Sequence, residues 1–180
     1  EEKLRMDEIG INHRSTRQPT GEVRNPGEWE PSEGVIIRWP LGIPVGIVAE
    51  MSEDILVYTI VANTSAQNSA ISSYTSGGVN MANTAWVFAA TDSYWTRDYA
   101  PWFIFDDLNL AIVDHVYNRP RPNDDAVPQA IGTAWGMAVH GMDLIHTGGN
   151  HMSDGLGISM STRLVYDENP KKNQAQEDQL

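Results

Sequence analysis

Short apolar runs of strand length alternate with short helical patterns along most of this sequence. Residues 55–62 form a continuous apolar run, and such runs suit a strand that is covered on both faces. Apolar residues at helical spacing precede this run in the segment 45–51. The run is followed by Asn63-Thr64-Ser65, whose side chains can cap the start of a second helix. This alternation of strands and helices predicts an α/β fold.

The same patterns place the other elements along the chain. Helices are expected at 44–53, 66–74 and 127–135. Strands are expected at 34–39, 55–62, 86–90, 139–145, 157–160 and 163–166, with a hairpin formed by 101–105 and 110–116. The Pro-rich segment 118–125 predicts a loop. Residues 1–27 are polar and show no apolar period, so we expect an extended arm there and a folded domain over 28–180.

The last residues indicate that this domain continues elsewhere. Glu168-Asn169-Pro170 is typical of a helix start, and residues 171–180 are good helix formers without a Gly, Asn or Pro that would end the helix. The preceding pattern predicts a further strand, which is missing. We therefore expect the domain to be truncated or nicked after residue 180.

Composition narrows the possible functions. The formal net charge of −12 would repel a nucleic acid on average and would attract a cationic substrate. The sequence contains no cysteine, which rules out disulfides, thiolate metal ligands and a cysteine nucleophile within these residues. Its apolar runs are too short to cross a bilayer.

The densest group of chemically useful side chains lies at 91–102, directly after an expected strand. Loops at the ends of strands commonly carry ligand sites in α/β proteins. The carboxylate of Asp98 could accept two parallel N–H bonds from a guanidinium, and Trp95 could stack on the same planar cation. Equally, Arg97 could form a surface pair with Asp92, and the tryptophan could belong to the core.

The motif Trp-x-Arg-Asp-x-x-Pro at 95–101 resembles the first signature of the guanidine-modifying superfamily, which includes agmatine, arginine and peptidylarginine deiminases. Segment 28–35 is similar to the opening of agmatine deiminases and their secreted bacterial relatives. Segments 81–83, 92–101, 117–125 and 146–150 together resemble the secreted peptidylarginine deiminases of periodontal bacteria. The resemblance extends from Trp29 to Leu180 and concerns the N-terminal portion of that family's domain only.

This resemblance implies a fold and a reaction. The family fold is a five-fold pseudosymmetric α/β propeller, of which this chain would form about two to three modules. The family reaction hydrolyses peptidyl-arginine to citrulline and ammonia through a cysteine-thiouronium intermediate, without a cofactor or a catalytic metal. The resemblance also implies secretion, in the manner of a virulence factor, and peptide or protein substrates that contain arginine.

The resemblance also assigns roles to individual residues. Asp98 would be the catalytic carboxylate that binds the guanidinium, with Trp95 beside it. Arg119 and Arg121 match the two arginines thought to hold the α-carboxylate of a C-terminal arginine, as paired guanidinium groups can. Alternatively, these arginines pair with Asp124 and Asp125 and brace their own loop.

The sequence departs from the family pattern in two ways. It has no cysteine, and it lacks the downstream His-x-Asp motif followed by an aromatic residue. We expect His146 to help shape a loop beside the cavity rather than to act as the general base, and we expect no metal site at His146, His151 and Asp154. The chain alone is therefore expected to be inactive and to associate with a C-terminal remainder that carries the catalytic Cys and His.

Two other functions remain open at this point. One is hydrolysis of agmatine or free arginine; agmatine has no carboxylate, so the paired arginines count against it. The other is a non-catalytic guanidinium-binding protein, which a native mass measurement would separate from an enzyme bound to a cysteine-bearing partner.

Overall fold

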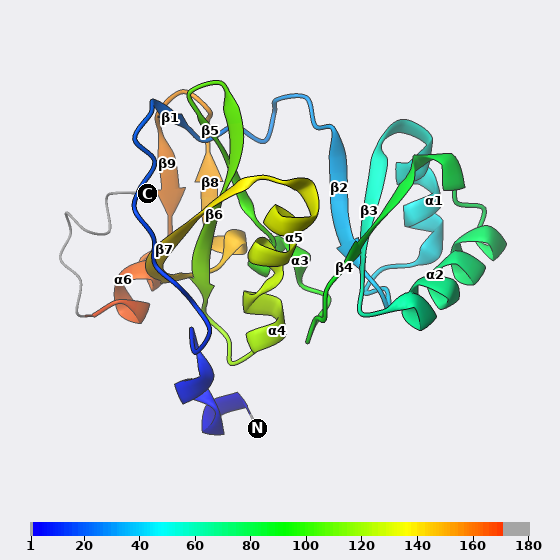
Figure 1. Cartoon of the computed structure of the whole chain (residues 1–180), viewed down its shortest axis with the longest axis horizontal. Coiled ribbons are helices and arrows are strands. Elements are labelled where there is room, and N and C mark those ends of the chain that lie inside the picture. The colour runs from blue at the N-terminus through cyan, green and yellow to red at the C-terminus, as the bar shows by residue number, and fades with distance from the viewer. Residues whose placement is uncertain (1, 171–180) are drawn as a thin grey trace. The chain divides into compact units, whose positions relative to one another are not determined.

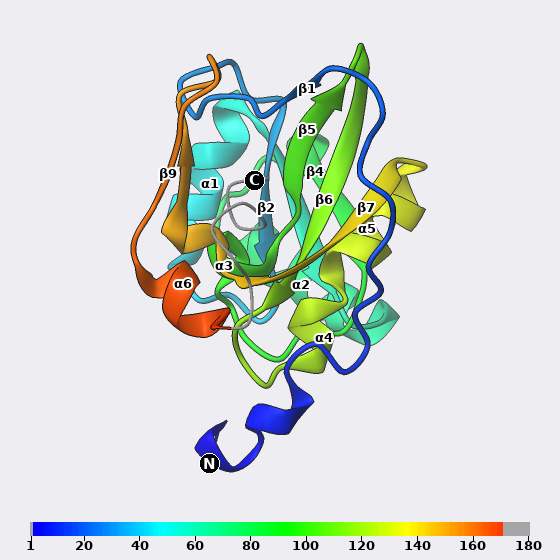
Figure 2. The ribbon, with the colours of Figure 1, turned by 90° about the vertical axis from the view of Figure 1, so that its left-hand side faces the viewer.

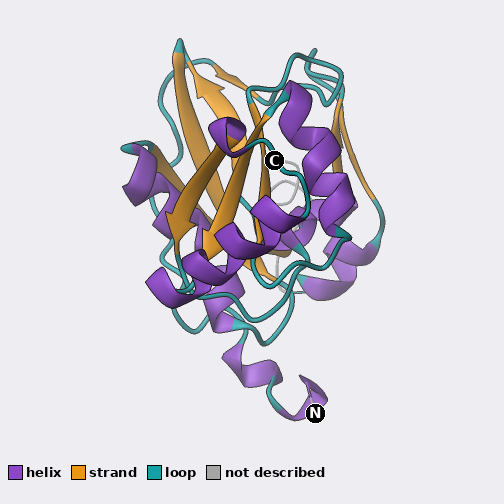
Figure 3. Ribbon diagram, turned by 90° about the vertical axis from the view of Figure 1, so that its right-hand side faces the viewer, coloured by secondary structure: helices purple, strands orange, loops and turns teal. Residues whose placement is uncertain are grey.

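The computed structural model describes residues 2–170 and consists of two compact units. Unit 2 comprises residues 31–96, and unit 1 comprises the chain before and after it. Helices and strands occur in both units (Figure 3), which confirms the expected mixed α/β fold.

Unit 2 is a small parallel α/β structure. Its sheet has the order β2-β3-β4, and both pairs of neighbours are parallel. Two helices connect the strands, contact β3 and lie on the same side of the sheet (Figure 1). The bounds of these elements are β2 (Gly34–Arg38), α1 (Val45–Asp54), β3 (Leu56–Val61), α2 (Thr64–Ser76), the 3-10 turn η3 (Met81–Asn83) and β4 (Thr84–Phe88).

The core of unit 2 is built around Tyr74, which is fully buried. Its ring stacks on Trp86 at a centroid distance of 5.9 Å and meets Trp39 edge-on at 6.3 Å. The Tyr74 hydroxyl is satisfied by Thr59 Oγ1 at 2.8 Å, so no polar group is left unpaired there. Helix α2 starts as the sequence predicts, with the Asn63 side chain accepting a hydrogen bond from the Ala66 N–H.

Unit 1 is organised around a mixed sheet with the order β1-β5-β6-β7. The β1–β5 and β5–β6 pairs are antiparallel, and β6 and β7 are parallel. Helices α4 and α5 contact β6, and α5 also contacts β7. The bounds are β1 (Val23–Arg24), β5 (Trp102–Asp106), β6 (Asn109–Tyr117), α4 (Pro122–Asp125), α5 (Val127–Trp135) and β7 (Ala138–His146). Helix α5 ends at Gly136, whose φ of 66° favours glycine.

Shorter elements complete unit 1. They are η1 (Glu2–Leu4), η2 (Met6–Glu8), α3 (Thr96–Tyr99), which begins at the unit boundary, η4 (Gly148–Asn150), β8 (His151–Ser153), β9 (Ser159–Ser161) and α6 (Leu164–Glu168). Strands β8 and β9 form an antiparallel hairpin, and β9 runs on to α6 (Figures 1 and 2).

Several sequence-based expectations for unit 1 were wrong. The strand expected at 163–166 is absent: residues 164–166 belong to helix α6 and Arg163 is its N-cap. The Asn169 side chain fixes this turn, since its amide donates to Val165 O and Ile145 O and accepts from Ile145 N. The strand expected at 157–160 begins at residue 159 and pairs with β8, which the pattern did not predict. The expected loop at 118–125 contains α4.

The N-terminal arm has more structure than its sequence suggests. Two 3-10 turns form at 2–4 and 6–8, and β1 pairs with β5. The helix expected at 171–180 lies outside the described residues. Among the described residues, no helix has the length and apolar character needed to span a membrane.

Candidate functional site

The candidate guanidinium ligand, Asp98, lies on the short helix α3 and is partly buried. The loop at 146–150 packs directly against it. A Cβ atom placed on Gly149 would lie 2.5 Å from Asp98 Oδ1, and one on Gly148 would collide with the carbonyl oxygen of Arg97. Thr147 Oγ1 donates to Asp98 O at 3.5 Å. The glycine pair therefore lets this loop approach the Asp98 carboxylate.

Trp95 belongs to unit 2, whereas Asp98 belongs to unit 1. The Trp95 side chain is half exposed and leans on Tyr94 at a centroid distance of 4.9 Å. Tyr94 in turn packs against Gly42, where a Cβ would overlap its ring. The indole is thus an exposed aromatic surface at the end of unit 2, and it does not belong to that unit's core.

The two candidate carboxylate-binding arginines lie between β6 and α4. Arg119 is exposed and donates only to Asn118 O, at 3.3 Å, among the described residues. Arg121 is partly buried, and its Nη1 donates to Tyr117 Oη at 3.4 Å. Asp125 accepts a hydrogen bond from the Tyr117 backbone N–H at 2.6 Å rather than pairing with either arginine.

Tyr117 lies close to the candidate arginines and to Asp98. Its ring is buried and packs edge-on against Tyr99, the residue after Asp98, at 5.9 Å. Burial raises the pKa of Tyr117 to about 12; Arg121 and Arg119 oppose this shift, whereas Asp98 and Asp124 add to it. Asp98, Arg119 and Arg121 are thus close enough to the Tyr117 hydroxyl to influence it electrostatically, and Arg121 is also hydrogen-bonded to it.

A cluster of rings, which the sequence analysis did not anticipate, lies beneath this site. Trp102 stacks on His115 and on His151, each at 4.4 Å, and meets His146 edge-on at 5.1 Å. His115 and His146 are essentially inaccessible. The sequence contained only a weak indication of this cluster. Side chains alternate between the two faces of a strand, and this alternation along β6 and β7 was the one pattern from which buried positions for His115 and His146 could have been predicted.

Burial keeps these imidazoles neutral. It lowers the pKa of His115 to about 3 and that of His146 to about 4, and the neighbouring histidines strengthen both shifts. Burial, and then the positive charge of Arg97, lowers the pKa of His151. Neutral rings are poor candidates for a cationic role, so this cluster supports the site by packing.

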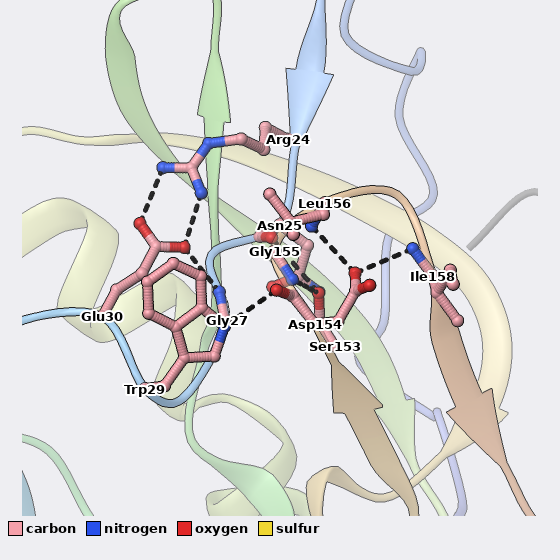
Figure 4. A network of polar contacts seen from close by, with 10 residues as sticks. All are labelled: Arg24, Asn25, Gly27, Trp29, Glu30, Ser153, Asp154, Gly155, Leu156 and Ile158. Carbon is pink, nitrogen blue, oxygen red and sulfur yellow. Dashed lines mark hydrogen bonds and ion pairs between the residues drawn. The ribbon is translucent and has the colours of Figure 1, made fainter.

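The segment that opens the domain braces the β8–β9 hairpin. Figure 4 shows Arg24 and Glu30 in a two-bonded ion pair and Trp29 Nε1 donating to Asp154 O at 2.9 Å. Asn25 Nδ2 lies 2.8 Å from His151 Nε2. Asp154 accepts from two backbone N–H groups of its own turn, and the described residues contain no cluster able to hold a metal ion.

Arg97, the other charged residue of the signature, forms an ion pair with Glu28. Both side chains are well exposed, and Arg97 Nη2 also donates to His151 O at 3.4 Å. The signature and the opening segment are therefore connected within unit 1.

The fold is that of a deiminase. The chain is similar to the agmatine deiminase of C. jejuni at 19% identity and a TM-score of 0.71, covering 92% of this chain and 53% of that one. It is also similar to the agmatine deiminase of Enterococcus faecalis at 23% identity and a TM-score of 0.72, covering 87% of this chain and 49% of that one. The chain thus spans about half the length of the solved structures that it matches.

The family model identifies the chain more specifically than the fold does. Residues 24–180 match the family model of the Porphyromonas-type peptidyl-arginine deiminases. The chain belongs to this family of guanidine-modifying hydrolases, and it corresponds to the N-terminal portion.

Proposed function

We propose that this chain forms the substrate-binding part of an enzyme that converts arginine at the C-terminus of peptides to citrulline and ammonia. The observation that carries the proposal is the grouping of Asp98, Arg119 and Arg121 around Tyr117 within unit 1. A carboxylate and two guanidinium groups are the partners required by the two charged ends of a C-terminal arginine. The acidic chain, with a net charge of −12, also attracts a cationic substrate.

In this mechanism Asp98 accepts N–H bonds from the substrate guanidinium and orients its carbon. The exposed indole of Trp95 is a further substrate-binding candidate, since it can stack on a planar cation. Arg119 and Arg121 hold the α-carboxylate. A cysteine thiolate attacks the guanidinium carbon, ammonia leaves from the tetrahedral adduct, and water hydrolyses the resulting thiouronium to citrulline. The thiol, and the histidine that protonates the departing nitrogen so that it leaves as ammonia, come from outside these 180 residues, which contain no cysteine.

We propose that a downstream part of the same protein supplies these groups, so that the chain alone is inactive. The complete domain would be a five-fold pseudosymmetric α/β propeller of a secreted enzyme. The hairpin β8–β9 is a suitable docking surface, because Met152 and Met160 are cross-strand partners and are both more than half exposed. Ile158, just before β9, extends this apolar surface.

The test compares three substrates with the complete enzyme: a peptide that ends in arginine, its C-terminal amide, and agmatine. Citrulline formation should be fastest with the free carboxylate. Arg121→Ala and Arg119→Ala should each lower kcat/KM for that peptide by roughly tenfold to a hundredfold, the loss expected for a charged hydrogen bond. The amide should lose little in either variant.

Arg163→Ala is the matched control, because Arg163 is an exposed arginine of unit 1 that pairs with Asp167 on α6. Equal losses on the free acid and the amide would contradict carboxylate recognition. Faster turnover of agmatine would favour a small-guanidine hydrolase. Failure of every substrate, with a stable folded chain that has no cysteine-bearing partner by native mass, would favour a binding protein.

A further inference from the structure

The guanidinium of Arg121 already has a carboxylate bound to it. Glu2 Oε1 lies 2.8 Å from Arg121 Nε and 2.7 Å from Arg121 Nη2. These two nitrogens form the edge of a guanidinium that binds carboxylates most directionally. Tyr117 Oη accepts from Nη1 and occupies the opposite side of the group. Glu2 therefore uses the same edge of Arg121 that a substrate carboxylate would use.

The first residues of the arm reach Arg121 because the following residues are fixed to unit 1. Thr16 exchanges hydrogen bonds with Gly141 on β7: the Thr16 N–H donates to Gly141 O, and the Gly141 N–H donates to Thr16 Oγ1, both at 2.9 Å. Nearer to the start of the arm, Gly10 lies close against Val116: a Cβ atom added to Gly10 would lie 2.8 Å from Val116 Cγ1. From these anchors, the two 3-10 turns bring Glu2 to Arg121.

The packing beneath the arm is loose. A hollow of about 400 Å³ is lined by arm residues that include His13 and Arg14 and by Asp114 and Gln129 of the sheet and helix. Asp114 Oδ1 and His13 Nε2 are buried without a hydrogen-bond partner among the described residues. Unpaired buried polar atoms and incomplete packing both reduce the stability gained when a segment docks. The docked arm is therefore stabilised less than a fully packed and fully hydrogen-bonded segment would be.

The arm also lies before the region that the family model matches. The family model matches from residue 24 onward, whereas Glu2 and the anchors at Gly10 and Thr16 come before that residue. Arg121 lies well within the matched region. A segment outside the family match thus contacts a residue that we assign to substrate binding.

We propose that the N-terminal arm, residues 2–16, is an internal competitor that places the Glu2 carboxylate on Arg121 until a substrate carboxylate displaces it. This inference rests on the proposed role of Arg121. Arg119, which is exposed, stays available to make the first contact with the incoming carboxylate. The competitor selects against ligands that lack a carboxylate, because only a carboxylate can form an ion pair with Arg121 equivalent to the one that Glu2 loses.

The experiment uses the complete enzyme and the variant Glu2→Gln. We expect KM for a peptide with a free C-terminal arginine to fall about two- to fivefold, the range for a partly exposed ion pair. The kcat should stay the same, and the peptide amide should show no change in KM. Asp7→Asn is the matched control: it removes one negative charge from the same arm and should leave both KM values unchanged.

Backbone amide hydrogen exchange of residues 2–8 provides a second measurement that does not depend on catalysis. Exchange in this segment should increase in Glu2→Gln, and in the unaltered enzyme on addition of the free-acid product peptide, but not of its amide. If the enzyme prefers free acids but Glu2→Gln changes neither KM nor hydrogen exchange, or changes only one of them, the proposal that the arm is a competitor would be overturned. Loss of the preference for free acids in every variant would refute the carboxylate role of Arg121 itself, and the competitor with it.

Discussion

The two units differ most in what they bury. Unit 2 has an apolar core in which the buried polar side chains are those of Ser52 and Thr59, both neutral and hydrogen-bonded. Unit 1 buries ionisable side chains, which are Asp114, His115, Asp124, Asp125, His146 and His151. Burying such groups costs free energy unless they are paired or neutralised. The contrast indicates that unit 2 packs around neutral side chains, whereas unit 1, which contains Asp98, Arg119 and Arg121, retains costly ionisable groups.

The largest expected effect tests whether the chemistry depends on unit 1. Asp98→Ala in the complete enzyme should lower kcat for arginine peptides by at least about 10² to 10³-fold, because the guanidinium loses the carboxylate that orients it. Asp54→Ala, an exposed change at the end of α1 in unit 2, should leave kcat unaltered. Citrulline release measures both. Equal effects of the two changes would remove the distinction between the units.

A smaller effect concerns acid stability. The folded pKa values of His115 and His146 lie below the unfolded value of about 6.5, so the unfolded chain binds more protons between these values. Their contribution to stability is complete above pH 6.5 and is lost as pH falls towards 4. Asp114 acts in the opposite direction, since burial raises its pKa to about 6 and its protonated form favours the fold.

His115→Phe isolates this effect because it keeps a ring against Trp102 and removes the titrating group. Between pH 7 and pH 4.5 the unaltered protein should lose more unfolding free energy than the variant, by on the order of 2 kcal/mol. Chemical denaturation at both pH values measures the difference. If both proteins lost the same stability, His115 would not titrate as a buried neutral ring.

The smallest effect compares two glycines. Gly149→Ala places a methyl group 2.5 Å from Asp98 Oδ1, so the carboxylate must move and kcat/KM should fall by about tenfold. Gly46→Ala, on α1 of unit 2, meets no atom within 4 Å and should leave activity unchanged while stabilising the helix slightly. Steady-state kinetics and thermal unfolding of both variants check this. An active Gly149→Ala enzyme would show that the loop need not approach Asp98 closely.

The same contrast explains which features the sequence could predict. Unit 2 follows local rules: β3 has a continuous apolar run, and Asn63 caps α2. In unit 1, tertiary contacts override local preference. Leu164-Val165-Tyr166 has the composition of a strand but is helical because Asn169 binds β7.

For the candidate site, the prediction depended on the family resemblance. The motif at 95–101 and the arginines at 119 and 121 indicated a guanidinium and a carboxylate through that resemblance, whereas their side-chain chemistry alone left surface ion pairs open as an alternative. The role of Tyr117, the histidine cluster around Trp102 and the contact of Glu2 with Arg121 depend on contacts between distant parts of the chain. No local pattern encodes such contacts.

The paired methionines of β8 and β9 have a practical consequence. A thioether that is open to solvent is converted by peroxide to a polar sulfoxide, whereas one covered by another protein surface is protected. Met152 and Met160 are 55% and 58% exposed, so their oxidation rates report directly on whether this hairpin is covered. Mass spectrometry after brief peroxide treatment, with and without the proposed downstream part, would therefore test whether this hairpin is the surface at which that part docks.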